Sequence, residues 1–144
     1  GKGATLMLIG SCLLTLVHIV FALPMDSYVV AIIMMLILGV AFGLVPSAMW
    51  PSVPKIIPEK QLGTAYALIF WVQNWGLMGV PALIGWVLDK YCKLDNSNGG
   101  PAYDYTLPMI IFMCFGILAL GVALLLKRED KIKVYGLELP NIKK

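Results

Sequence analysis

Four long stretches of this chain contain no charged side chain. Asp, Glu, Lys and Arg occur only in five short segments, at Lys2, at Asp26, from Lys55 to Lys60, from Asp89 to Asp104 and from Lys127 onward. A hydrocarbon layer about 30 Å thick is crossed by roughly 20 apolar residues in a helix, and a charge at its centre costs several kcal/mol. The charge-free stretches meet both conditions and predict membrane-spanning helices.

The predicted spans cover residues 4–23, 28–50, 62–88 and 105–126, and a polar tail covers 127–144. They define an all-α fold, an integral membrane bundle of four transmembrane helices. Charged residues make up 13% of the chain, against about a quarter in soluble domains, which disfavours four buried helices of a large soluble protein. The stretches also lack the alternation of membrane β-strands.

Prolines follow the apolar part of the second span, at Pro46, Pro51, Pro54 and Pro58. A proline removes a backbone donor and clashes with the preceding turn of a helix. The sequence therefore predicts kinked or broken helix beyond Val45. Pro81 predicts a kink in the third span, whose length implies tilt or a protruding end.

The basic residues are divided unequally between the two sides of this topology. One side holds only Lys90 and Lys93, and the other holds nine: Lys2, Lys55, Lys60, Lys127, Arg128, Lys131, Lys133, Lys143 and Lys144. Basic residues are retained on the cytoplasmic side of a membrane. The division predicts that both termini and the loop from Lys55 to Lys60 are cytoplasmic, with the loop from Asp89 to Asp104 outside.

Several function classes lack the residues that they require. The chain has no glycine-rich phosphate loop, no paired carboxylates within a span and no Ser/His/Asp or Cys/His grouping. Its three cysteines, Cys12, Cys92 and Cys114, fit neither a disulfide framework nor a metal site. A net charge of +3 is too small to indicate nucleic acid. We expect no enzymatic activity, no metal, no cofactor and no nucleic-acid partner; the first partner is the lipid bilayer.

Glycines in the second and third spans indicate close helix packing. Gly39 and Gly43 have the spacing of a GxxxG motif, with Ser47 one turn further along the same face. Missing side chains let a second helix approach and gain dispersion contacts. Static packing is the favoured interpretation over a sliding face in a transport cycle. Gly76 and Pro81 are the corresponding packing candidates of the third span.

The third span carries the most informative polar residues. Tyr66, Phe70, Gln73 and Leu77 follow steps of three and four residues and share one helix face, with Asn74 beside it. Two carboxamides within a span are costly unless they bind other helices or water. The hypothesis is a solute pathway lined by Tyr66, Gln73 and Asn74. The alternative, interhelical hydrogen bonds with no solute, remains equally open.

His18 is the only histidine and lies in the first span. A proton relay requires an acidic neighbour, and no predicted span contains one. A packing or hydrogen-bonding role is therefore favoured.

Three segments resemble one family of secondary transporters, the major facilitator superfamily. They are Pro58-Glu-Lys-Gln-Leu-Gly-Thr-Ala-Tyr66, the pair Gln73-Asn74, and Gly85-Trp-Val-Leu-Asp89. Together they look like the eleventh helix of that fold, in the branch containing lysosomal proteins and their bacterial relatives. The segment Ala48-Met-Trp-Pro51 is similar to the end of the tenth helix. Gly1-Lys2 would end the basic loop before the ninth helix, but the acidic and glycine residues of that loop are absent.

The resemblance implies that the four spans are helices nine to twelve of a twelve-helix major facilitator fold. The remaining eight helices would be partners, and the membrane would be the bacterial cytoplasmic membrane. The resemblance implies a central path nearest Ser47 and Trp50, with Tyr66, Phe70, Gln73 and Asn74 next and His18 and Cys114 peripheral. It also implies alternating access, in which two halves rock about a midplane site.

Three functions follow in order of preference. The first is a fragment of a secondary transporter that moves a small organic solute. The second is a stand-alone four-helix assembly or scaffolding subunit that docks through Gly39 and Gly43. The third is a small dimeric exporter of cationic drugs, which ranks lowest because such exporters depend on a carboxylate within the membrane.

Overall fold

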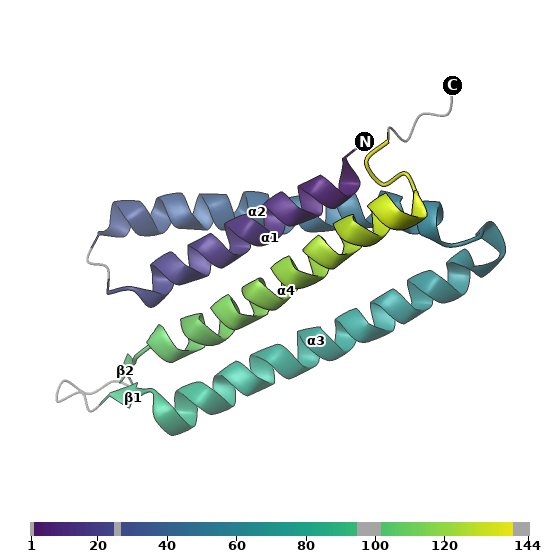
Figure 1. Ribbon diagram of the computed structural model, residues 1–144. Helices are drawn as coiled ribbons and strands as arrows, with labels where there is room; N and C mark the ends of the chain where they lie inside the picture. The colour runs from purple at the N-terminus through teal and green to yellow at the C-terminus, as the bar shows by residue number, and fades with distance from the viewer. Residues whose placement is uncertain (1, 25–26, 95–101, 140–144) are drawn as a thin grey trace.

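The computed structural model describes residues 2–24, 27–94 and 102–139 and contains four long helices (Figure 1). They are α1 (Gly3–Ala22), α2 (Tyr28–Ile56), α3 (Leu62–Tyr91) and α4 (Thr106–Lys133), with a short 3-10 turn η1 (Glu59–Gln61) before α3. Parts of three predicted segments, at Met25 and Asp26, at 95–101 and at 140–144, lie outside the described residues.

The all-α membrane fold class is confirmed. All four helices are long and apolar enough to cross a membrane. Large apolar side chains cover the outside of the bundle, with Leu36 68% and Phe42 72% exposed. A protein in water would bury such side chains, because their transfer out of water drives folding. Here lipid is the medium that they face.

Helix α1 lies between α2 and α4 and packs along both. Small residues form these contacts, including Ala4, Gly10, Ser11 and Thr15 of α1. Helix α3 runs beside this group but touches α2 and α4 at few points (Figure 1). The bundle is therefore a three-helix unit with one loosely attached helix.

The close approaches within the three-helix unit occur at Gly3, Gly10 and Gly116. A Cβ atom at Gly10 would lie 2.8 Å from Cγ2 of Val45, and one at Gly116 would lie 2.7 Å from Oγ1 of Thr15. Lipid provides no hydrophobic driving force between helices, so the dispersion contacts that small residues allow help hold membrane helices together. Gly39 and Gly43, in contrast, have no atom within 4 Å of a built Cβ. The described part of the chain puts no helix against the GxxxG face.

The sequence predicted a kinked or broken helix beyond Val45: the break is wrong, and the kink stays a prediction. Helix α2 continues through Pro46, Pro51 and Pro54 to Ile56, six residues beyond the predicted end. Each proline leaves one carbonyl, four residues earlier, without its usual N–H donor. For Pro54 this is the carbonyl of Trp50, which accepts a hydrogen bond from the Tyr66 hydroxyl at 3.4 Å. A neighbouring helix thus partly replaces the missing donor.

The fourth helix also extends beyond its predicted end. Helical residues continue to Lys133, so the first seven residues of the predicted tail are helical. Glu129 and Lys133, one turn apart, form an ion pair of 3.2 Å on the exposed side. Such pairs and basic residues in the last turn favour helix at a C-terminus.

A two-stranded hairpin closes the α3–α4 connection. Strands β1 (Lys93–Leu94) and β2 (Ala102–Tyr103) pair antiparallel, and the Asp104 N–H donates to the Cys92 carbonyl at 2.8 Å. Cys92 is only 4% exposed. Strands of two residues are too short to produce a recognisable alternation, so the sequence indicated only a loop here.

Replacing Gly116 with alanine tests the close packing of α1 and α4. The added Cβ would lie 3.1 Å from the Thr15 Cα atom, and backbone cannot move as freely as a side chain. We expect Gly116→Ala to lower stability by about 1–3 kcal/mol, measured by thermal unfolding in a mild detergent. Gly121→Ala on the same helix is the matched control, because nothing lies within 4 Å of its built Cβ. Equal unfolding temperatures for the two variants would contradict the packing described here.

Candidate functional site

An aromatic cluster of Trp50, Tyr66 and Phe70 joins α2 to α3. It lies near the C-terminal end of α2 and the N-terminal end of α3, which η1 connects. The ring of Trp50 lies 5.0 Å from that of Phe70 and 5.7 Å from that of Tyr66, between centroids. Tilted aromatic pairs at these distances contribute about 0.5–1.5 kcal/mol beyond their burial. Trp50, Tyr66 and Phe70, which the sequence placed on a solute path, are thus brought together by the fold.

Among the polar residues of the predicted path, only Tyr66 bonds to another helix within the described residues, through its hydroxyl and the Trp50 carbonyl. Ser47 donates to the Leu44 carbonyl at 2.9 Å, and Asn74 donates to the Phe70 carbonyl at 2.9 Å, so both bond only to their own helix. Gln73 is exposed and on the same face of α3 as Phe70. The alternative of hydrogen bonds between these carboxamides and α1, α2 or α4 therefore has no support in the described residues.

An apolar groove continues from this cluster toward the hairpin end of α3. Its volume is about 690 Å³, and Phe42 of α2 and Phe112 of α4 line it opposite a series of α3 residues: Gly76, Leu77, Val80, Pro81, Ile84, Gly85 and Leu88. Gln73 precedes Leu77 by one turn on the same face. Along this face of α3 the rings of Tyr66 and Phe70 come first. The Gln73 carboxamide follows, and the apolar groove comes next toward the C-terminal end of the helix.

Gly76 and Pro81, the predicted packing residues of α3, line this open groove. A Cβ built at Gly76 meets nothing within 4 Å, and Pro81 is exposed. Helix α3 remains α-helical through Pro81. Their role in helix packing stays a prediction, as does the packing role of Gly39 and Gly43.

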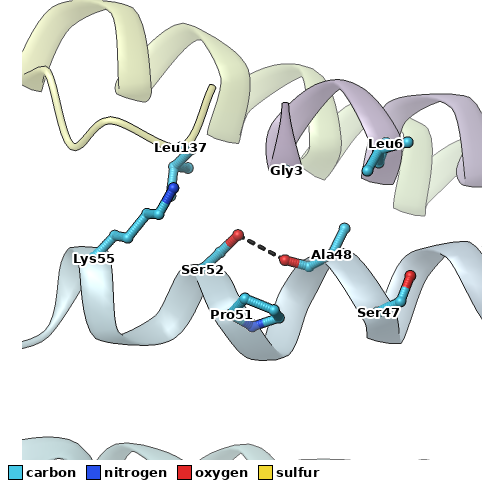
Figure 2. Close-up of a pocket in the computed structure, with 8 residues that line it drawn as sticks. All are labelled: Gly3, Leu6, Ser47, Ala48, Pro51, Ser52, Lys55 and Leu137. Atoms are coloured by element: carbon cyan, nitrogen blue, oxygen red, sulfur yellow. Dashed lines mark hydrogen bonds between the residues drawn. The ribbon is translucent and has the colours of Figure 1, made fainter. Parts of the chain in front are cut away.

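A second, smaller pocket of about 180 Å³ lies where Gly3 and Leu137 meet α2 (Figure 2). Ser47, Ala48, Pro51, Ser52 and Lys55 of α2 line one side of it, and Gly3, Leu6 and Leu137 line the other. The Ser52 hydroxyl donates to the Ala48 carbonyl at 2.7 Å and so is satisfied within α2. Ser47 is the one predicted path residue that this pocket includes.

Leu137 of this pocket belongs to residues 134–139, which we call the C-terminal clasp. Lys55 reaches across from α2 and donates to the carbonyls of Gly136 at 2.9 Å and Leu139 at 2.8 Å. The Leu137 N–H donates to the buried carboxylate of Asp130 at 3.0 Å. The clasp therefore binds the ends of α2 and α4 together.

The clasp also holds the start of α1. The Gly3 N–H donates to the Leu137 carbonyl at 2.8 Å. The Glu138 carboxylate accepts from the N–H and the hydroxyl of Thr5, each at 2.9 Å, and Lys127 donates to the same hydroxyl at 3.0 Å. An N-terminal helix end has free N–H groups and favours a carboxylate. Glu138 supplies that carboxylate.

Sequence reasoning did not identify the clasp. Lys55, Asp130 and Glu138 read as ordinary charges of polar loops. One signal was available: Leu137 is an apolar residue within a charged tail, and in the structure it is 1% exposed.

Removing the Asp130 carboxylate tests the clasp. Asp130→Ala leaves the buried Leu137 N–H without an acceptor, which costs about 1–3 kcal/mol. We expect a lower unfolding temperature in detergent and faster trypsin cleavage after Lys133. Glu129→Ala is the control, since it removes only an exposed ion pair worth about 0–1 kcal/mol. If trypsin cleaved both variants at one rate, the clasp would not be holding the segment.

The fold, its exposed apolar surface and the open groove define this chain as a multi-spanning α-helical membrane protein. No protein-family model and no solved structure matches it. Three relatives are each a lysosomal dipeptide transporter MFSD1. The Danio rerio protein is 34% identical over 107 residues, 74% of this chain and 21% of the relative. The Gallus gallus protein is 46% identical over 57 residues, 40% of this chain and 13% of the relative.

The Mus musculus protein is likewise 46% identical, over 58 residues that make up 40% of this chain and 12% of the relative. These relatives confirm the expected resemblance to the major facilitator superfamily, in the branch with lysosomal members. The chain spans only about an eighth to a fifth of their length.

Proposed function

We propose that this chain is part of a secondary transporter that moves a small organic solute across a membrane by alternating access. The observation that carries the proposal is the α3 face with Tyr66, Phe70 and Gln73, which leads into an apolar groove open to the outside of the described bundle. Polar side chains in a span belong in a protein interior or a water-filled cavity. In a longer protein this face would line such a cavity.

The short match to each relative supports the fragment interpretation. The four helices would correspond to the ninth to twelfth of a twelve-helix protein, with eight further helices facing the groove and the GxxxG surface. Small peptides are the first substrate class to test, because the relatives are dipeptide transporters. We place both termini in the cytoplasm and the protein in a bacterial cytoplasmic membrane, following the distribution of basic residues and the resemblance.

Alternating access requires elements that move as units. The clasp and the glycine contacts tie α1, α2 and α4 together, while α3 has few contacts with them. In the proposed cycle α3 would move relative to the three-helix unit. The aromatic cluster would be the contact between α3 and this unit. The predicted spans 4–23, 28–50, 62–88 and 105–126 contain no Asp or Glu for proton coupling. Any coupling group would lie elsewhere in the longer protein, and a uniporter fits the spans equally.

A four-helix assembly subunit is the second candidate. The uncovered surface at Gly39 and Gly43 favours it, because small-residue faces dock other helices. The coding sequence before Gly1 separates the two: an open reading frame that encodes further hydrophobic spans supports the transporter. A start codon directly before Gly1 supports the subunit.

Substitutions on the α3 face test the proposed path. In the longer protein, Gln73→Ala and Asn74→Ala should each lower dipeptide uptake by about tenfold, the effect of one lost polar contact. Membrane abundance, measured by immunoblot, should not change. Leu83→Ala is the control, since Leu83 is exposed on α3 but does not line the groove. Unchanged uptake in both carboxamide variants would assign Gln73 and Asn74 to packing alone.

A further inference from the structure

A basic hollow lies on α4 at the end of its apolar stretch. It has a volume of about 250 Å³ and is lined by Leu124, Lys127, Arg128 and Lys131. These positions are separated by three, four and seven residues, so they share one face of the helix. Leu126 is the last residue before the charges, which puts the hollow at the boundary between the hydrocarbon layer and water.

The acidic residues of this region are turned away from the hollow or already engaged. Asp130 is buried and accepts the Leu137 N–H. Glu129 pairs with Lys133 on the opposite side of α4. Glu138 accepts both donors of Thr5. Lys127, Arg128 and Lys131 therefore line one hollow, and the acidic residues of this region among the described residues are engaged elsewhere.

The cations also keep donors to offer. Lys127 donates one N–H to Thr5, and an ammonium group has three. Arg128 and Lys131 are exposed and take part in no ion pair among residues 2–24, 27–94 and 102–139. Arginine matches phosphate oxygens with two parallel hydrogen bonds. The hollow thus offers the planar guanidinium of Arg128, the ammonium group of Lys131 and the two remaining N–H donors of Lys127.

The apolar side of the hollow indicates the source of the phosphate. Leu124 is 52% exposed directly below the cations, on the hydrocarbon side. We propose that this hollow binds the phosphodiester headgroup of an anionic phospholipid, with an acyl chain along Leu124. Basic pockets at the cytoplasmic ends of membrane helices recognise such headgroups. The proposal depends on the membrane placement of α4 and is independent of any transport activity.

Lipid retention tests the site. The chain is reconstituted in vesicles of equal parts phosphatidylcholine and phosphatidylglycerol, extracted in a mild detergent and weighed by native mass spectrometry with its retained lipids. We expect one preferentially retained phosphatidylglycerol. In Arg128→Gln/Lys131→Gln this preference should fall by about fivefold per removed charge, about twenty-five-fold in all.

Lys60→Gln/Lys133→Gln is the matched control. It removes the same net charge from the same end of the bundle, at two exposed residues outside the hollow. Retention in this control should equal that of the unmodified chain. An equal loss in both double variants would show diffuse attraction and overturn the site. Displacement of the lipid by millimolar inorganic phosphate would also overturn the proposal, because it would assign the hollow to a soluble anion.

Discussion

A hydrocarbon layer provides no hydrogen bonds, and most of this structure follows from that constraint. Each backbone group within the layer must be paired by its own helix or by a neighbour. The hydroxyls of Ser11, Thr15 and Ser52 return to carbonyls one turn earlier in their own helices. The Trp50 carbonyl that Pro54 leaves open accepts from Tyr66 of another helix. One of the few contacts between α2 and α3 thus arises where Pro54 leaves a carbonyl without its helical N–H donor.

The same constraint explains which residues hold the helices together. In lipid, burying a leucine between helices gains little, because the tails that it leaves are equally apolar. Close contact between small residues does gain dispersion energy. Helix α1 approaches α2 at Gly10, and α4 approaches α1 at Gly116. The described polar bonds between elements of this unit lie at one end, where the clasp links Lys55, Asp130 and Glu138 to backbone and to Thr5. Two kinds of contact, at different depths, therefore stabilise one three-helix unit.

The four long apolar helices were predictable because charge is excluded from the layer at high cost, and charged residues are visible one by one in the sequence. Helix ends were less so: α4 continues past Lys127 because the boundary of the membrane is not the boundary of a helix. Which glycine packs was not predictable, since Gly39/Gly43 and Gly10/Gly116 differ only in what the fold puts beside them. On the candidate site, helix periodicity was enough to group Tyr66 and Phe70. Their contact with Trp50 depended on the α2–α3 turn, which local sequence does not determine.

The surfaces of α2 and α3 that no described helix covers include both apolar and polar side chains. A large apolar side chain facing lipid is stable, so Leu36 requires no partner. Gln73 is different, because its carboxamide has donors and an acceptor that lipid cannot satisfy. It lies between an aromatic cluster and an apolar groove, and glycines leave space along both helices. A surface that combines unsatisfied polar groups with missing side chains is suited to water and close helices, and poorly suited to lipid. That combination, more than the length of any span, is what favours a transporter interior over a self-contained four-helix bundle.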